Sequence, residues 1–196
     1  EASFEKMHAT WRAMVESGEG YDPARRSACN LTDGDARKVE TRAVSLAGPV
    51  LTDIIATALK VGECNACMGR IVAAPTAGAS GVLPAVLLPI RKKYDFSEEE
   101  MVKALYVSAG LGQVIATRAS IAGAEGGCQA EIGSASAMAA AALVSLLGGS
   151  PEQMAAACAT ALQNLLGLVC DPVAGLVEVP CVKTVSYTHL TLPTIY

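Results

Sequence analysis

The sequence has little of what marks a nucleic-acid-binding or membrane-spanning protein. Aromatic residues make up 4% of its 196 residues, and charged residues make up only 17%. The net charge is −4 and no basic stripe is present, which argues against binding to nucleic acid. The most apolar run, from Ile132 to Leu147, is too short to span a bilayer, so we interpret it as a buried core helix and expect no membrane association.

The first residues lack a basic segment followed by an apolar one, so the cytoplasm is the expected compartment. The chain has seven cysteines, and cytoplasmic thiols more often bind metals or act in catalysis than form disulfides. Only two histidines are present, His8 and His189, and the CxxC of Cys64 and Cys67 has no second copy. These absences disfavour a zinc domain or a redox motif. Two helical thiols are the simpler interpretation of this CxxC.

Small apolar residues dominate what is present. Hydrophobic residues make up 52% of the chain, and with so few aromatics the core must be built from alanine, leucine and valine. No segment alternates convincingly over a strand length, since Leu176 to Val182 is short and contains Pro180. We therefore predict an all-α fold, in which small-residue-rich helices surround a buried central helix and cysteines lie on loops.

Local signals place the helices. Ser97 with Glu100, and Ser150 with Gln153, form two capping-box patterns that predict helix starts. Apolar residues recur at helical spacing from Phe4 onward. The predicted helices cover approximately 4–17, 39–59 with a break near Pro49, 82 onward, 98–121, 132–147 and 151–168.

The stretch from Pro75 to Gly81 joins a short apolar run to an apolar helix through small residues. Gly78 would let the backbone approach a ligand closely, and Thr76 and Ser80 supply hydroxyls. Backbone N–H groups at the start of the following helix would attract an anion such as a carboxylate. A tight helix–helix crossing, which also needs small residues, explains the stretch as well.

Three further cysteines, Cys128, Cys170 and Cys181, each lie beside glycine, proline or an acidic residue rather than within a uniform apolar face. Thiolates from separate loops can hold a metal cluster if the fold brings them together. They could instead be three small buried hydrophobic residues, because free cysteine is among the most buried residue types. Spacing alone leaves both interpretations open.

Longer motifs relate the chain to a known family. The segments NACMGRIVAAPTAGASGVLPAVLL, AGAEGGCQAEIGSASAMAAAAL and NLLGLVCDPVAGLVEVPC resemble the iron–sulfur-dependent L-serine dehydratase alpha chain, over roughly Thr32 to Lys183. In that family three cysteines hold a [4Fe–4S] cluster. Their separations of 42 and 11 positions are those of Cys128, Cys170 and Cys181 here. The resemblance implies that these three cysteines are the ligands of the iron–sulfur cluster.

The resemblance also implies a substrate-binding role for Thr76, Ala77, Gly78 and Ser80. The implied enzyme is a lyase that dehydrates and deaminates L-serine to pyruvate and ammonia, without pyridoxal phosphate, in amino-acid metabolism and gluconeogenesis. One open iron would act as a Lewis acid on the substrate hydroxyl, while a general base takes the Cα proton.

The sequence does not assign that general base. Glu125, Glu131 and Asp171 lie closest to the cysteines along the chain. Each is more simply explained as a helix cap or as an acceptor of backbone hydrogen bonds.

Two alternatives remain at this point: a related lyase that acts on L-cysteine, and a helical subunit or interaction module without activity of its own. The resemblance further implies a beta domain or beta chain as partner, and an oligomer. We expect residues 1–183 to form the alpha-type domain, truncated at both ends, and residues 184–196 to be a non-native tail. The chain alone is then expected to be an incomplete enzyme.

Overall fold

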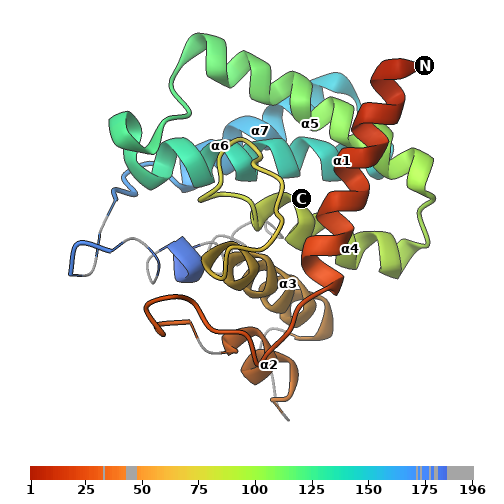
Figure 1. The fold of residues 1–196 in the computed structure, drawn as a ribbon. Coiled ribbons are helices and arrows are strands. Elements are labelled where there is room, and N and C mark those ends of the chain that lie inside the picture. The colour runs from red at the N-terminus through yellow and green to blue at the C-terminus, as the bar shows by residue number, and fades with distance from the viewer. Residues whose placement is uncertain are drawn as a thin grey trace.

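The computed structural model describes residues 1–32, 34–42, 48–170, 172, 174–176, 178 and 181–184. Within these residues the regular elements are helices, which confirms the predicted all-α class (Figure 1). A short helical turn also covers 181–184. In chain order the longer helices are α1 (Ala2–Glu19), α2 (Asp35–Glu40), α3 (Gly48–Ala66), α4 (Val82–Tyr94), α5 (Glu98–Arg118), α6 (Gly123–Leu146) and α7 (Pro151–Asn164).

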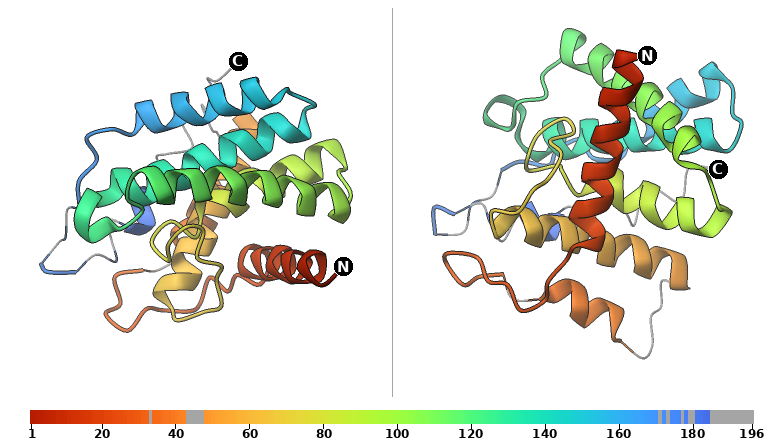
Figure 2. Two further views of the ribbon diagram at one scale, coloured as in Figure 1. Left: turned by 90° about the horizontal axis from the view of Figure 1, so that it is seen from above. Right: turned by 45° about the vertical axis from the view of Figure 1, so that its right-hand side comes forward.

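Helix α6 is the predicted buried central helix. It packs between α5 and α7, which run beside it in one layer, and against α4 (Figure 2). Residues 132–142 are all buried, and most are alanine or serine, so neighbouring helices come close. A Cβ on Gly112 of α5 would lie 2.8 Å from the Met138 sulfur, so Met138 would have to move. Gly110 faces open space, so close packing requires glycine at position 112 and not at position 110.

Both capping boxes form as predicted. The Ser97 hydroxyl accepts the Glu100 N–H, and the Glu100 carboxylate accepts the Ser97 N–H at 2.8 Å. Ser150 and Gln153 make the same reciprocal pair at the start of α7. Each box satisfies N–H groups that the first helical turn leaves without intrahelical partners. The starts of α5 and α7 are therefore specified locally.

Helix ends depart from the predictions. Helix α5 ends at Arg118 and α7 at Asn164, before the predicted ends near Ile121 and Leu168. The segment that begins at Gly123 is helical and joins the rest of α6 across a kink at Gly127, so this helix begins earlier than the predicted residue 132. Tertiary contacts explain the early end of α7, because the chain after it turns back to lie across this kink.

The first half of the chain packs around α3 and α4. Helix α3 contacts α2 and α4, and α1 crosses α3, α4 and α5 (Figure 1). Pro49 lies in the first turn of α3, so the break predicted near it separates α2 from α3. A small apolar cluster of Ala36, Leu59 and Val182 attaches the 181–184 turn to α2 and α3. No helix in the described part of the chain has both the length and the apolar character needed to cross a bilayer.

Candidate active site

A cavity of about 440 Å³ lies where three parts of the chain meet: the end of α3, the loop before α4, and the C-terminal residues Leu176, Glu178, Cys181 and Val182. Ala77, Gly78 and Ser80 of the predicted substrate-binding stretch line it, and so does Cys181. Figure 1 shows the loop before α4 in yellow and the 181–184 turn in blue, both close to the end of α3. The fold therefore joins two sequence motifs that lie about a hundred residues apart.

The 75–81 loop carries polar groups that lack partners. Thr76 Oγ1 and Ser80 Oγ are buried, and neither forms a hydrogen bond in the described structure. The loop folds into successive turns in which Ala79 N–H donates to Thr76 O and Ser80 N–H donates to Ala77 O. No described acceptor bonds the backbone N–H of Ala77 or Gly78. Buried hydroxyls without partners are costly, which indicates that a ligand satisfies at least one of those of Thr76 and Ser80.

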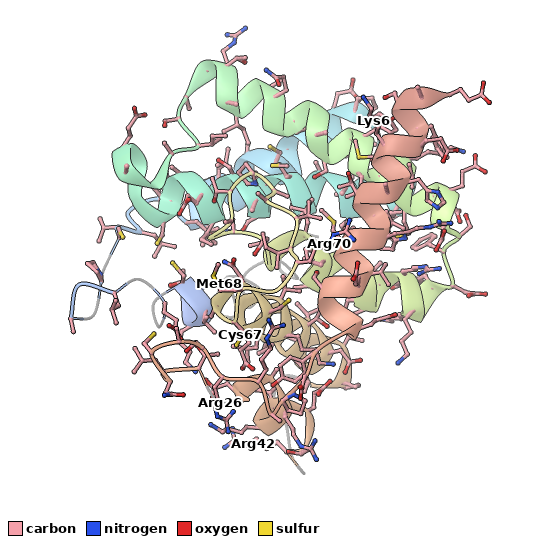
Figure 3. All side chains as sticks on the ribbon, viewed as in Figure 1. Lys6, Arg26, Arg42, Cys67, Met68 and Arg70 are labelled. Atoms are coloured by element: carbon pink, nitrogen blue, oxygen red, sulfur yellow. The ribbon has the colours of Figure 1, made fainter. Side chains whose placement is uncertain are left out.

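Asn65 anchors this loop to α3. Its amide Nδ2 donates to Ala77 O at 3.1 Å, and the residue also lines the cavity. Met68, which follows in the chain, is 88% exposed at the cavity edge (Figure 3). Sequence reasoning missed Asn65, because no local pattern distinguishes it between the two cysteines of the CxxC.

The fold brings together the three predicted ligands, Cys128, Cys170 and Cys181, which we call the three-cysteine group. Cys128 lies just after the α6 kink, Cys170 lies in the segment after α7, and Cys181 begins the 181–184 turn. All three are free thiols. They are near enough for Cys128 and Cys170 each to raise the pKa of Cys181, and for Cys170 to raise that of Cys128.

Gly127 makes this approach possible. Its φ of 68° is in the region where glycine is favoured, and a Cβ there would lie 3.1 Å from the Cys170 nitrogen and 3.0 Å from the Val169 Cα. Two hydrogen bonds join the part of α6 just after the kink to the segment after α7. The Gln129 N–H donates to Leu168 O at 2.9 Å, and the Gly167 N–H donates to Gln129 Oε1 at 2.8 Å. Cys128 and Cys170 are therefore positioned by backbone contact.

Without a cation, Cys128 and Cys181 hold their thiol protons more tightly than a free cysteine does, because the pKa of each is raised. Burial raises the pKa of Cys181 to about 11, with further increases from Cys128, Glu131 and Cys170. Burial, then Cys170 and Glu131, raises the pKa of Cys128. A bound metal replaces these protons with positive charge, as metal binding to thiols generally does.

This donor set fits an iron–sulfur cluster. The thiolates that hold such a cluster bind different iron atoms and need not converge on one point. Cys181 lines the cavity, and Cys128 and Cys170 are near enough to raise its pKa. Across the described residues, no three His, Cys, Asp or Glu side chains converge as the ligands of a single metal ion do.

The acidic residues near the three-cysteine group differ in their surroundings. Glu125 accepts a hydrogen bond from the Ser120 hydroxyl at 2.6 Å, as expected of an acid at a helix start. Glu131 Oε2 lies 3.1 Å from the Cβ position of Gly78 and 2.7 Å from that of Gly123. Asp171 lies outside the described residues. Glu131 is therefore the acid that the fold places against the 75–81 loop.

Glu178 holds the far wall of the cavity to the N-terminal half of the chain. Its carboxylate accepts hydrogen bonds from Cys29 and Thr32, and it lines the cavity. Lys183 forms an ion pair with Asp35 nearby. Sequence reasoning missed this role of Glu178, since no local pattern links it to residues almost 150 positions earlier.

The CxxC is adjacent to the site but does not form part of it. Asn65 and Ala66 line the cavity, whereas Cys64 Sγ contacts Arg70 O at 3.6 Å. Burial raises the pKa of both Cys64 and Cys67, and reactive cysteines need a lowered one. The structure therefore favours the interpretation of two structural thiols.

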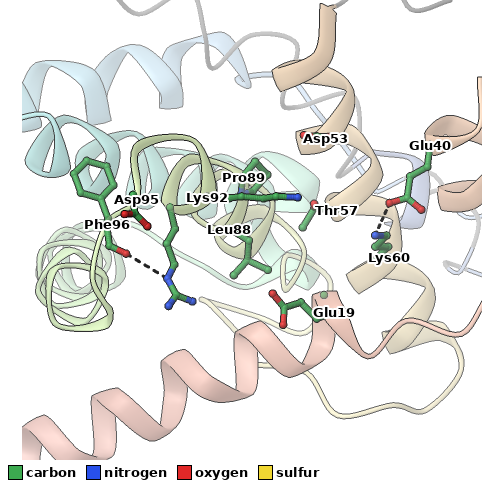
Figure 4. Close-up of a pocket in the computed structure, with 12 residues that line it drawn as sticks. Glu19, Glu40, Asp53, Thr57, Lys60, Leu88, Pro89, Lys92, Asp95 and Phe96 are labelled. Atoms are coloured by element: carbon green, nitrogen blue, oxygen red, sulfur yellow. Dashed lines mark hydrogen bonds and ion pairs between the residues drawn. The ribbon is translucent and has the colours of Figure 1, made fainter. Parts of the chain in front are cut away.

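A second cavity, of about 420 Å³, lies between α1, α3 and α4 (Figure 4). Charged side chains of both signs line it, and two of its basic groups already have partners. Lys60 pairs with Glu40 at 2.5 Å, and Arg91 donates to Phe96 O at 3.4 Å while lying over the Trp11 ring. It contains none of the predicted site residues.

The fold and the site define an all-helical domain in which a cavity is lined by the unsatisfied hydroxyl group of Ser80 and by one of three neighbouring thiols. The family profile named "Serine dehydratase alpha chain" matches residues 1–189. The chain belongs to the serine dehydratase alpha chain family, which confirms the resemblance found in the sequence.

Relatives agree with this family. The chain is 52% identical over 160 residues to the "Probable L-serine dehydratase, alpha chain" of Bacillus subtilis, covering 80% of this chain and 53% of the relative. It is 51% identical over 154 residues to the "L-serine dehydratase, alpha chain" of Peptoniphilus asaccharolyticus, covering 77% and 53%. For the "L-serine dehydratase TdcG" of Escherichia coli, identity is 50% over 127 residues, covering 64% and 28%. The chain thus spans about half the length of the alpha chains it matches.

Proposed function

We propose that this chain forms the alpha part of an iron–sulfur L-serine dehydratase, which converts L-serine to pyruvate and ammonia. The observation that carries the proposal is the cavity shared by the 75–81 loop and Cys181, with Cys128 and Cys170 close to that same cysteine. Membership of the serine dehydratase alpha chain family and the names of the relatives support it.

The three-cysteine group would hold a [4Fe–4S] cluster at the cavity edge. When bound, such a cluster supplies a Lewis-acidic iron with an open position, which makes the substrate hydroxyl a better leaving group. The 75–81 loop would bind the substrate carboxylate, because it offers free N–H groups on Ala77 and Gly78 together with the Thr76 and Ser80 hydroxyls. Serine held in this way directs its β-hydroxyl toward the cysteines.

The net reaction removes the Cα proton and the β-hydroxyl of serine as water, leaving aminoacrylate. Its hydrolysis gives pyruvate and ammonia, which places the enzyme in amino-acid metabolism and, through pyruvate, in gluconeogenesis. We leave the base unassigned, because the relatives extend well beyond the matched length and a beta domain or beta chain can supply it. We further propose assembly with that beta part in an oligomer, in the cytoplasm, where thiols stay reduced.

The test is anaerobic reconstitution of the chain with iron and sulfide, followed by assays with a serine dehydratase beta polypeptide. Pyruvate formation from L-serine, together with broad absorption near about 400 nm, is the expected result. If the cluster absorption is present and the assembly releases sulfide from L-cysteine but does not turn over L-serine, the result would instead indicate a cysteine lyase. If the assembly holds an iron–sulfur cluster but turns over neither L-serine nor L-cysteine, the proposal is contradicted.

A further inference from the structure

Glu131 is a partly buried carboxylate without a donor. Across the residues that the structure describes, no hydrogen bond or ion pair reaches it. Its Oε2 lies against two glycines instead, 3.1 Å from the Cβ position of Gly78 and 2.7 Å from that of Gly123. Because Glu131 is partly accessible and no described donor bonds it, its carboxylate can pair with an incoming cation. The site therefore has a place for a positively charged group.

Glu131 also lies between the two parts of the proposed site. Gly78 belongs to the 75–81 loop, which lines the cavity, and the Glu131 charge raises the pKa of both Cys128 and Cys181. Glycine at positions 78 and 123 leaves room for the carboxylate, because a methyl group at either position would crowd it.

The chemistry of the substrate explains this arrangement. In an α-amino acid, the ammonium and carboxylate groups are attached to the same carbon, so the groups that bind them must be neighbours. The loop offers uncharged donors suited to a carboxylate, and the adjacent Glu131 offers an anion suited to an ammonium. The hydroxyl, one carbon farther, then reaches toward the cysteines.

We propose that Glu131 binds the α-ammonium group of the substrate and thereby selects α-amino acids over hydroxy acids that lack the amine. The proposal rests on the proposed function, because it assigns the loop to the substrate carboxylate. It differs from a role as general base, which would mainly affect turnover rather than binding.

Binding to protein without the iron–sulfur cluster measures this directly, because no turnover occurs. We would titrate the chain, assembled with its beta part, with L-serine and with 3-hydroxypropanoate, which is serine without its ammonium. In Glu131→Gln, the dissociation constant for L-serine should rise about 10- to 100-fold, the range of a hydrogen bond to a charged group. Affinity for 3-hydroxypropanoate should stay the same or improve.

Glu125→Gln is the matched control, since it removes the same charge from the same helix, at a position where the acid already bonds Ser120. It should leave both dissociation constants unchanged. In the loaded enzyme, Glu131→Gln should keep its absorption near about 400 nm and raise KM more than it lowers kcat. Unchanged serine affinity in Glu131→Gln, or equal weakening of both ligands, would overturn the proposal.

The two proposals fail in different ways. If wild-type enzyme does not dehydrate serine, the proposed function fails whatever the variant does. If wild-type enzyme turns over serine and Glu131→Gln still binds it normally, only the ammonium site is wrong.

Discussion

The two groups of cysteines in this molecule differ in how sequence distance relates to structure. Cys64 and Cys67 are three positions apart, yet Cys64 contacts the Arg70 carbonyl, and it is Asn65 and Ala66 that line the cavity. The three-cysteine group spans gaps of 42 and 11 positions, yet its thiols affect one another electrostatically. Proximity here comes from the kink in α6 and the return of the chain after α7, which no short motif encodes.

The largest expected effect is on retention of the iron–sulfur cluster. Serine at Cys128, Cys170 or Cys181 should abolish the absorption near about 400 nm after anaerobic reconstitution, because each would bind a separate iron. The matched controls are serine substitutions at Cys64 and Cys67, which should retain it. Equal loss in these controls would shift the site to the CxxC.

The second effect concerns the kink. Alanine at Gly127 must adopt a φ of 68° and also meet the backbone of Val169 and Cys170, so we expect destabilisation of about 3 kcal/mol or more. Gly148 is the control, because its φ is 80° and no atom lies within 4 Å of its Cβ position. Gly148→Ala should cost only about 1–2 kcal/mol of backbone strain.

Chemical denaturation measures both free energies of unfolding, and absorption reports retention of the iron–sulfur cluster. Gly148→Ala should keep the cluster and Gly127→Ala should lose it. Equal costs and equal retention would show that backbone contact at Gly127 does not position Cys170.

The third effect tests the closeness of the thiols without iron. Cys181 should titrate near its pKa of about 11, as followed by thiolate absorbance in the cluster-free chain. Replacing Cys128 with serine should lower the pKa of Cys181, because one neighbouring negative charge disappears. Cys64→Ser should leave that pKa unchanged. An unchanged titration in Cys128→Ser would mean that the two sulfurs lie far apart.

The same pKa shift makes stability depend on pH. Since the folded chain holds the Cys181 proton more tightly than the unfolded chain, this contribution is fully present below about pH 9. It is lost as the pH rises toward 11, by at most about 2 kcal/mol. Cys181→Ser should flatten this part of the pH profile.

The smallest effect concerns Asn65, which lies between the CxxC cysteines. Asn65→Ala removes its hydrogen bond to Ala77 O and should loosen the 75–81 loop. We expect KM for L-serine to rise roughly 2- to 10-fold, the range for one neutral hydrogen bond, with the iron–sulfur cluster retained. A loss of the cluster with normal KM would contradict this assignment.

Much of the fold follows from local sequence. The capping boxes at Ser97 and Ser150 gave two helix starts, and the alanine-rich run gave the buried central helix, because these signals act within a few residues. The predicted helix ends were wrong where contacts between distant parts of the chain determine them. Helix α7 stops at Asn164 because the following backbone bonds Gln129 across the kink.

The site was only partly predictable. Family resemblance supplied the three-cysteine group and the loop, while spacing alone left buried hydrophobic residues as an alternative. The position of Glu131 against Gly78 depends on how α6 crosses the loop, so it could not be read from the chain. The contacts of Glu178 with Cys29 and Thr32 depend in the same way on long-range folding.

The most direct test of the central claim is the iron and acid-labile sulfide content of the reconstituted chain, measured beside a variant with serine at Cys128, Cys170 and Cys181. The account predicts about four irons and four sulfides per wild-type chain, and neither in the triple variant. Iron and sulfide retained by the triple variant would contradict it.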